Sequence, residues 1–244
     1  VYSTFLQRAY DQIVHDVCLQ NLPVCILSDH VGLVGDDGKT HHGVLSVPML
    51  MSIPNLTLLA PRDTRQIRQA VRATLKLDGP CVVQYPKEGI EPYAQNVTGE
   101  PFAVGKWQTL IPGGQDAVIL AYGRMTQNAI QASELLVQRG LSVGVIDCCS
   151  LKPLDMDCLR ALFERRAKIV TIEEGEMIGG FGSEIARVCV EENADAPVQI
   201  IGLENRFITH GSVPELLREC GLMPEQLADR IEEIAGDKES SHVG

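Results

Sequence analysis

The sequence lacks three features that would place it in a specialised class of proteins. It has no excess of basic residues: 21 Lys and Arg stand against 32 Asp and Glu, for a formal net charge of -11, whereas nucleic-acid binding needs a basic face. No apolar run approaches the roughly 20 residues that span a membrane. No CxxC pair occurs among the eight cysteines. We therefore expect a soluble, cytoplasmic protein with no nucleic-acid or membrane partner, and reduced, mostly buried thiols.

The chain also lacks a signal peptide and an initiator Met. It begins VYSTFLQRAY, and that start suggests a piece of a longer protein. Its 45% hydrophobic and 22% charged residues are typical of a globular protein. A length of 244 residues allows one large domain or two ordinary ones.

Helix and strand patterns alternate in the first half. Residues 4–20 have helical spacing, and short apolar runs predict strands at 24–29, 56–61 and 81–86. Asp63 is placed to cap a helix between the last two strands. Uninterrupted apolar strands with helices between them predict a parallel sheet that is covered on both faces.

The alternation lapses and then restarts. Residues 96–115, rich in Gly, Pro and polar residues, predict a linker with a possible short hairpin. We expect two three-layer α/β/α domains with mainly parallel sheets, a partial one over 1–95 and a complete one over 116–244. The second has predicted strands at 116–123, 141–151, 168–174 and 198–204, with helices at 126–139, after Asp155 and after Gly182, and two more near the C-terminus.

One loop, DDGKTHHG (36–43), carries many titratable groups between glycines. It follows a strand end, as does YPK (85–87), and ligands of parallel sheets bind where such loops gather. A histidine there can exchange a proton near neutral pH, and neighbouring cations can hold an anion. The alternative is a loop that is polar because it is exposed. The side chains expected at this edge are Tyr2, Phe5, Arg8, His30, Asp37, His41, His42 and Lys87.

Three other features favour structural explanations. The glycines of GGFG (179–182) precede a helix, but no Walker lysine follows, so a tight, closely packed turn is favoured over a phosphate loop. Glu173, Glu174 and Glu176 predict a solvated or interface-facing acidic edge rather than a metal site, and we expect no metal ligands. His210 is assigned to a subunit interface or to the cap of a turn.

Several stretches together resemble the 1-deoxy-D-xylulose-5-phosphate synthases. They include YSTFLQRAYDQIVHDV, GLVGDDGKTHHG, GPCVVQYPK, IDCCSLKPLD, IVTIEEGEMIGGFGSEI and IGLENRFITHGS, and the resemblance is collinear over residues 1 to about 235. It implies a transketolase-like layout, of which this chain holds most of the pyrimidine-binding domain and all of the last domain. It also implies thiamine diphosphate and Mg²⁺ as cofactors, a missing N-terminal diphosphate-binding domain or subunit as partner, and a homodimer.

The resemblance further implies a reaction and the roles of individual residues. Enzymes of that family decarboxylate pyruvate and join the two-carbon unit to glyceraldehyde 3-phosphate, a step toward isoprenoids and thiamine. Phe5 would pack on the aminopyrimidine ring, and Arg8 would support the cofactor side. Tyr2, Asp37 and His41 would line the substrate pocket, with His41 near the reacting carbonyl. The glutamate that activates the cofactor would lie in the missing part, so this chain alone is expected to be inactive.

Two positions depart from the family pattern. His30 and Lys87 stand where the family usually has arginines that bind the acceptor's phosphate. Losing two bidentate contacts weakens phosphate binding by roughly 1.5–3 kcal/mol each. Three hypotheses stay open: a fragment of a deoxyxylulose phosphate synthase, the small subunit of a split transketolase-like enzyme with another acceptor, and a non-catalytic module of the same fold.

Overall fold

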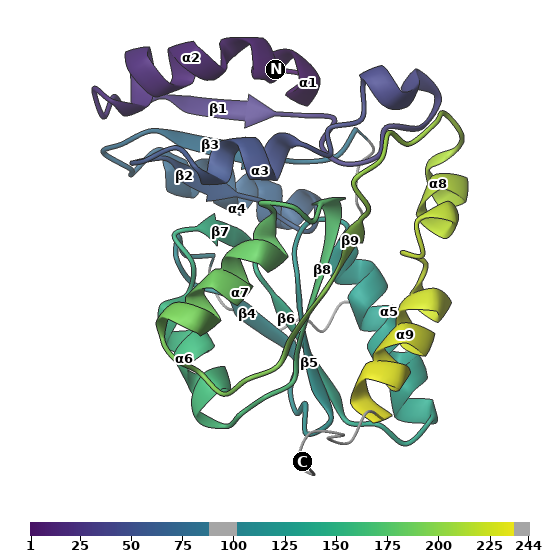
Figure 1. The fold of residues 1–244 in the computed structure, drawn as a ribbon. Helices are drawn as coiled ribbons and strands as arrows, with labels where there is room; N and C mark the ends of the chain where they lie inside the picture. The colour runs from purple at the N-terminus through teal and green to yellow at the C-terminus, as the bar shows by residue number, and fades with distance from the viewer. Residues whose placement is uncertain (88–101, 237–244) are drawn as a thin grey trace.

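The computed structural model of the protein describes residues 1–87 and 102–236, and the predicted fold class is confirmed (Figure 1). Two mainly parallel sheets are each packed between helices. The first domain lies above the second in the view of Figure 1, and the two meet along a broad seam. The sequence-based boundaries of 1–95, 96–115 and 116–244 stay a prediction.

The first sheet has the strand order β1-β3-β2-β7. Its central strand β3 is buried at every residue, as its uninterrupted apolar run predicts. β1 and β2 are both parallel to β3, so their C-terminal ends lie at one edge. The strands are β1 Cys25–Ser28, β2 Thr57–Leu59, β3 Cys81–Gln84 and β7 Ser150–Lys152.

Helical turns cover this sheet. The predicted N-terminal helix is present as a broken series that ends at Cys18, and Asp63 caps α4 by accepting from the Gln66 N–H at 2.7 Å. The sequence did not indicate α3 or the turn η3. The elements are α1 Ser3–Leu6, η1 Gln7–Ala9, α2 Tyr10–Gln12, η2 Ile13–Cys18, η3 Gly35–Thr40, α3 Ser46–Met51 and α4 Thr64–Thr74.

The second sheet has the order β4-β6-β5-β8-β9, with only β4 antiparallel to its neighbour. Helices α6 and α7 cover one face, and α5 and α9 cover the other (Figure 1). The strands are β4 Gln108–Ile111, β5 Ala117–Ala121, β6 Val143–Asp147, β8 Ile169–Glu176 and β9 Val198–Leu203. The helices are α5 Met125–Gln138, α6 Met156–Glu164, α7 Phe181–Glu191, α8 Val213–Glu219 and α9 Pro224–Gly236.

Two details of the chain course differ from the sequence-based expectation. The single strand predicted over 141–151 is wrong, because the chain turns at Cys148 and Cys149 and its continuation, β7, joins the first sheet beside β2. The sequence does not show this change, because no Gly, Pro or Asn marks a turn at Cys148 and Cys149. Within the segment predicted as a linker, 96–101 lies outside the described residues, and β4 forms near its end.

Other expectations can be compared directly with the described residues. Asp155 caps α6 by accepting from the Cys158 N–H at 3.1 Å, as predicted. All eight cysteines are free thiols, also as predicted, and Cys25 is the one that is exposed. Over 1–87 and 102–236, no helix is long and apolar enough to cross a membrane.

A buried polar network joins the two domains. The Asp147 carboxylate at the end of β6 is fully buried and paired with the guanidinium of Arg62, which precedes α4. The Gln66 amide donates to the same carboxylate at 2.6 Å, and Arg62 also donates to Gln108 Oε1 at 2.7 Å. Burying a carboxylate costs several kcal/mol unless its partners are well placed, so these contacts fix how the domains fit together.

This network predicts an unequal effect of two arginine substitutions. Arg62→Ala leaves the buried Asp147 carboxylate without its cation, so the free energy of unfolding should fall by about 3–5 kcal/mol. Arg139→Ala removes surface ion pairs with Asp229 and Glu232 and should cost about 1 kcal/mol or less. Urea unfolding of both variants measures the difference. Equal losses would contradict a role for the network in joining the domains.

Candidate functional site

Three chain segments meet where β1 and β3 end. Tyr2 forms a parallel bridge with Asp29 just beyond β1, and the Ser3 N–H donates to the Asp29 carbonyl at 2.9 Å. The Tyr85 N–H, just beyond β3, donates to the Ser28 carbonyl at 3.0 Å. The N-terminal segment, the loop after β1 and the loop after β3 therefore lie at one edge of the sheet.

Aromatic and imidazole rings cluster at this edge. Tyr2 stacks on His30 with ring centroids 4.0 Å apart and an interplanar angle of 17°. His41 meets the edge of this pair, 5.5 Å from the Tyr2 centroid. Phe5 lies 5.1 Å from Tyr2 and 6.0 Å from His41. The structure thus brings these four predicted residues into one cluster.

Asp37 connects the loop to both neighbouring segments. Its Oδ2 accepts from the Tyr2 hydroxyl at 3.2 Å and from Lys87 Nζ at 3.3 Å. The hydrogen bond from Lys87 holds the pKa of Asp37 below its ordinary value, so the carboxylate is charged near neutral pH. Burial, and then the Asp37 charge, raises the pKa of Tyr2 to about 12. Tyr2 is therefore a hydrogen-bond donor.

His30 is held in a restricted backbone conformation. Its φ of 57° lies in the left-handed region, which few residues other than glycine adopt. Its Nδ1 lies 3.1 Å from Asp29 Oδ1, although the two are not aligned for a hydrogen bond. Such local strain is typical of sites that the surrounding structure fixes firmly.

Glycine is required at the base of the same loop. Gly32 has a φ of +78°, and a Cβ there would lie 2.7 Å from Glu174 Cδ. At Gly43 a Cβ would lie 2.4 Å from the His30 carbonyl oxygen. The loop returns close to its own start, where the Gly43 N–H donates to the Gly32 carbonyl at 2.8 Å. This close approach leaves little room for a Cβ at either glycine.

Comparison with known families assigns both halves of the chain. Residues 1–91 match the family described as the pyrimidine binding domain of transketolase, and residues 105–227 match the transketolase C-terminal domain. The chain belongs to the transketolase family. Both matches agree with the two domains of the structure.

Named relatives make the family more specific. Proteins named 1-deoxy-D-xylulose-5-phosphate synthase from Geobacillus thermodenitrificans, Thermus thermophilus and Rippkaea orientalis are 42%, 41% and 39% identical over 98%, 92% and 96% of this chain. The chain spans only 38%, 35% and 37% of their lengths.

Solved structures of the same family share the fold. One, described as a split gene transketolase in an inactive beta4 tetramer, is 28% identical with a TM-score of 0.86, and covers 98% of this chain and 76% of its own. A transketolase mutant from Pichia stipitis, 18% identical, has a TM-score of 0.77 and covers 98% of this chain and 34% of its own.

A pocket beside the ring cluster fits part of a flat heteroaromatic cofactor. It has a volume of about 470 Å³ and is lined by Phe5, Arg8, Thr4, Gln7 and Thr40. The Phe5 side chain is 60% exposed, so one ring face is open to a second ring. Arg8 is exposed beside it, with no carboxylate of the described residues in ion-pair distance. These residues of the transketolase-family chain suit the pyrimidine ring that the domain's name implies.

His42 does not join the ring cluster. It is buried, its Nδ1 accepts from the Val34 N–H at 3.1 Å, and its Nε2 therefore carries the proton and donates to the Thr209 carbonyl at 2.9 Å. His210 follows Thr209 in the sequence, and a Cβ placed on Gly38 would lie 3.3 Å from the Cβ of His210. Both histidines thus lie where the loop touches the second domain.

The acidic residues in the C-terminal part of β8 correct the sequence-based expectation. Glu173, Glu174 and Glu176 were expected at a solvated or interface-facing edge, and the solvated alternative is wrong because all three are buried. Glu174 accepts from the Leu33 N–H at 2.8 Å, across the seam between the domains. Among the described residues, no three His, Cys, Asp or Glu side chains are grouped to hold a metal. In the sequence, only the position of these acids at the end of an apolar strand hinted at a contact with another part of the protein.

The glycine turn before α7 is closed to an outside ligand. Glu173 accepts from the N–H groups of Phe181 and Gly182, both at 2.9 Å. A Cβ at Gly182 would lie 2.4 Å from Thr171 Oγ1, so this glycine allows close packing. The packed turn predicted for GGFG is the observed one. Burial raises the pKa of Glu173 to about 7.

The shared Asp37 oxygen predicts a change in acidity. Lys87→Met removes the cation that stabilises the Asp37 carboxylate, so the pKa of Asp37 should rise toward its ordinary value. Titration of the carboxyl ¹³C signals, with Asp37→Asn to assign the resonance, measures the shift. Lys39→Met removes an exposed lysine from the loop that carries Asp37 and should leave the pKa of Asp37 unchanged. An unchanged Asp37 pKa in Lys87→Met would refute the pairing.

The buried Glu173 predicts a pH dependence of stability. Its pKa is about 7 in the folded protein and near 4.5 ordinarily. Between those values the folded protein binds more protons than the unfolded chain, so the free energy of unfolding falls as pH rises, by roughly 2–3 kcal/mol. Urea unfolding from pH 4.5 to 7 should show this slope in the wild type and not in Glu173→Gln. Parallel slopes would show that Glu173 does not titrate in this range.

Proposed function

We propose that this chain forms, together with a diphosphate-binding domain or subunit, a thiamine diphosphate-dependent enzyme of the transketolase type. The proposed reaction joins the two-carbon unit of pyruvate, after loss of carbon dioxide, to glyceraldehyde 3-phosphate. Its product is 1-deoxy-D-xylulose 5-phosphate, a precursor of isoprenoids and thiamine. The proposal also includes Mg²⁺ on the partner, a homodimeric assembly and a cytoplasmic location.

One observation carries the proposal: a proton-handling cluster lies beside a pocket with an open aromatic face. His41, Asp37 and Tyr2 form the first part, and Phe5 forms the second. Relatives that share 39–42% of their residues with this chain are named for this reaction's product. A non-catalytic module has no physical reason to keep a charged carboxylate, a stacked histidine and an exposed aromatic ring together.

The residues of the site divide the chemical work. When bound, thiamine diphosphate supplies an electron sink for the loss of carbon dioxide from a 2-oxo acid. His41 has Nδ1 hydrogen-bonded to Thr40 Oγ1 at 2.9 Å, which leaves Nε2 to act as proton donor to an acceptor carbonyl oxygen. The charged Asp37 accepts a hydrogen bond from a substrate hydroxyl, and Tyr2 donates one.

A second candidate function concerns the organisation of the enzyme. The split gene transketolase, a chain of similar extent and fold, supports the proposal that the present chain is one subunit of a split enzyme. His30 and Lys87 then serve a different acceptor, because neither offers the permanent, bidentate charge with which arginine binds phosphate. Both candidates require a partner for activity, since no residue here is assigned to activate the cofactor.

The proposal predicts activity only on reconstitution. The chain is mixed with the remaining part of the Geobacillus thermodenitrificans relative, thiamine diphosphate, Mg²⁺ and pyruvate, and carbon dioxide release is followed with and without glyceraldehyde 3-phosphate. We expect release stimulated by the aldehyde, and deoxyxylulose phosphate as product. His41→Asn should lower kcat by about 10²–10⁴-fold, the usual contribution of a positioned proton donor.

A matched substitution controls for loss of a histidine. His15→Asn alters an exposed histidine on the N-terminal helical segment, paired only with Asp11 among the described residues, and should leave the rate unchanged. Release of carbon dioxide without that product would favour the second candidate. Activity of the chain alone, or none from an assembled complex, would refute both.

A further inference from the structure

The loop that carries Asp37 and His41 is bonded to the second domain at its first turn. The Leu33 N–H donates to Glu174 Oε1 at 2.8 Å, in a buried contact between residues 141 positions apart. Glu174 is at the C-terminal part of β8, so an interior strand of the second sheet holds the backbone of the first domain. Gly32 has a φ of +78°, and a Cβ there would lie 2.7 Å from Glu174 Cδ, so any other residue would be strained and would displace the Glu174 carboxylate.

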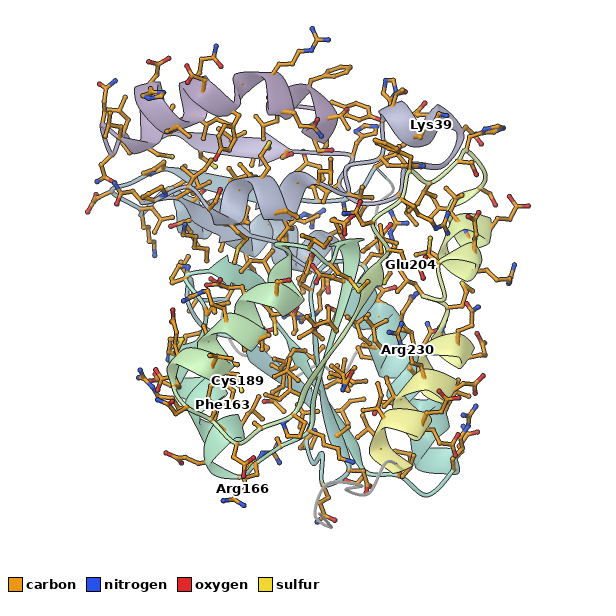
Figure 2. The ribbon with its side chains drawn as sticks, viewed as in Figure 1. Lys39, Phe163, Arg166, Cys189, Glu204 and Arg230 are labelled. Atoms are coloured by element: carbon orange, nitrogen blue, oxygen red, sulfur yellow. The ribbon has the colours of Figure 1, made fainter. Side chains whose placement is uncertain are left out.

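A second contact lies at the other end of the loop. The His42 ring bridges the Val34 N–H and the Thr209 carbonyl, at 3.1 and 2.9 Å. Thr209 belongs to the segment between β9 and α8, which passes beside the loop in Figure 1. Figure 2 shows Lys39 on this loop at the top right and Glu204, at the end of β9, below it. The second domain therefore holds both ends of the loop.

The Glu174 contact has an anchor behind it. Arg124, at the start of α5, lies with Nε 3.5 Å from Glu174 Oε2, and both side chains are nearly buried, at 12% and 8% exposed. A buried carboxylate held beside a guanidinium has little freedom to turn. The carboxylate can thus act as a fixed acceptor for the loop backbone.

We infer that Glu174 and His42 are positioning residues for the proposed reaction: they clamp the loop from the second domain and so set the places of Asp37 and His41. Both catalytic side chains lie between the clamps, on an exposed segment with a 3-10 turn over Gly35–Thr40. Displacing a reacting group by about 1 Å can cost about 10²-fold in rate. The inference rests on the proposed function and adds a catalytic task to the second domain.

The first test uses the chain alone and needs no catalysis. Backbone hydrogen exchange at Leu33 and Val34, and the ring-current shift that Tyr2 imposes on His41, are measured by NMR. Glu174→Ala should speed exchange of the Leu33 amide at least about tenfold and reduce the shift of His41. Leu159→Ala, which truncates a buried leucine of α6 in a core cluster that does not include Leu33, lowers overall stability and should leave both readings unchanged.

Conservative variants separate positioning from packing. Glu174→Gln keeps an acceptor for the Leu33 N–H. Arg124→Met in the same chain removes the guanidinium charge that would otherwise be left without its carboxylate. This double variant should keep the His41 shift. His42→Gln can still accept from Val34 and donate to Thr209, whereas His42→Phe can do neither. We expect slow hydrogen exchange of the Val34 amide to be kept in His42→Gln and lost in His42→Phe.

The second test uses the reconstituted enzyme. Glu174→Ala and His42→Phe should lower kcat by about 10–100-fold and change the KM for pyruvate by less than about threefold, with the Gln variants restoring most of the rate. Faster exchange with unchanged kcat would overturn the positioning role. An unchanged His41 shift in Glu174→Ala would overturn it in the chain alone. A wild type that assembles without turnover would instead refute the proposed function, while the NMR result still decides whether the clamp sets His41.

Discussion

Buried carboxylates at the seam between the two domains fix how those domains fit together. Asp147 and Glu174 are both at or near the ends of second-sheet strands, and each accepts a hydrogen bond from a first-domain group. A carboxylate that loses such partners stays buried and unsatisfied, at a cost of several kcal/mol. Small sliding motions between the domains would break these bonds. The seam therefore has one favourable arrangement rather than a range of them.

The same seam places the candidate site. The loop after β1 and the chain after β3 leave the first sheet toward its C-terminal edge, where ligands of parallel sheets bind. β7 belongs to the second half of the chain but pairs with β2, so covalent continuity and sheet pairing both tie the halves together. A first domain without the second would lose an edge strand and the support of its most polar loop.

The sequence predicts the repeated, local part of this structure well. Apolar runs mark the buried strands, and Asp63 and Asp155 mark helix starts, because these signals act over a few residues. The gathering of Tyr2, Asp37 and His41 follows from strand ends at a common edge. The sequence does not show that Glu174 faces inward or that β7 changes sheets. Both depend on contacts with residues about 90 or more positions away.

Charge pairing beside the ring cluster limits how the proposed acceptor could bind. Lys87 already shares Asp37 with Tyr2, and His30 faces Asp29 while stacked on the Tyr2 ring. Under the proposed function, a phosphate on the acceptor would therefore compete with the Asp37 carboxylate for the Lys87 ammonium. Breaking that pair would leave Asp37 with the Tyr2 hydroxyl as its donor and remove the cation that lowers the pKa of the carboxyl group. Under the proposed function, the charge of the acceptor and the protonation of the cluster would thus be coupled through one carboxylate oxygen of Asp37.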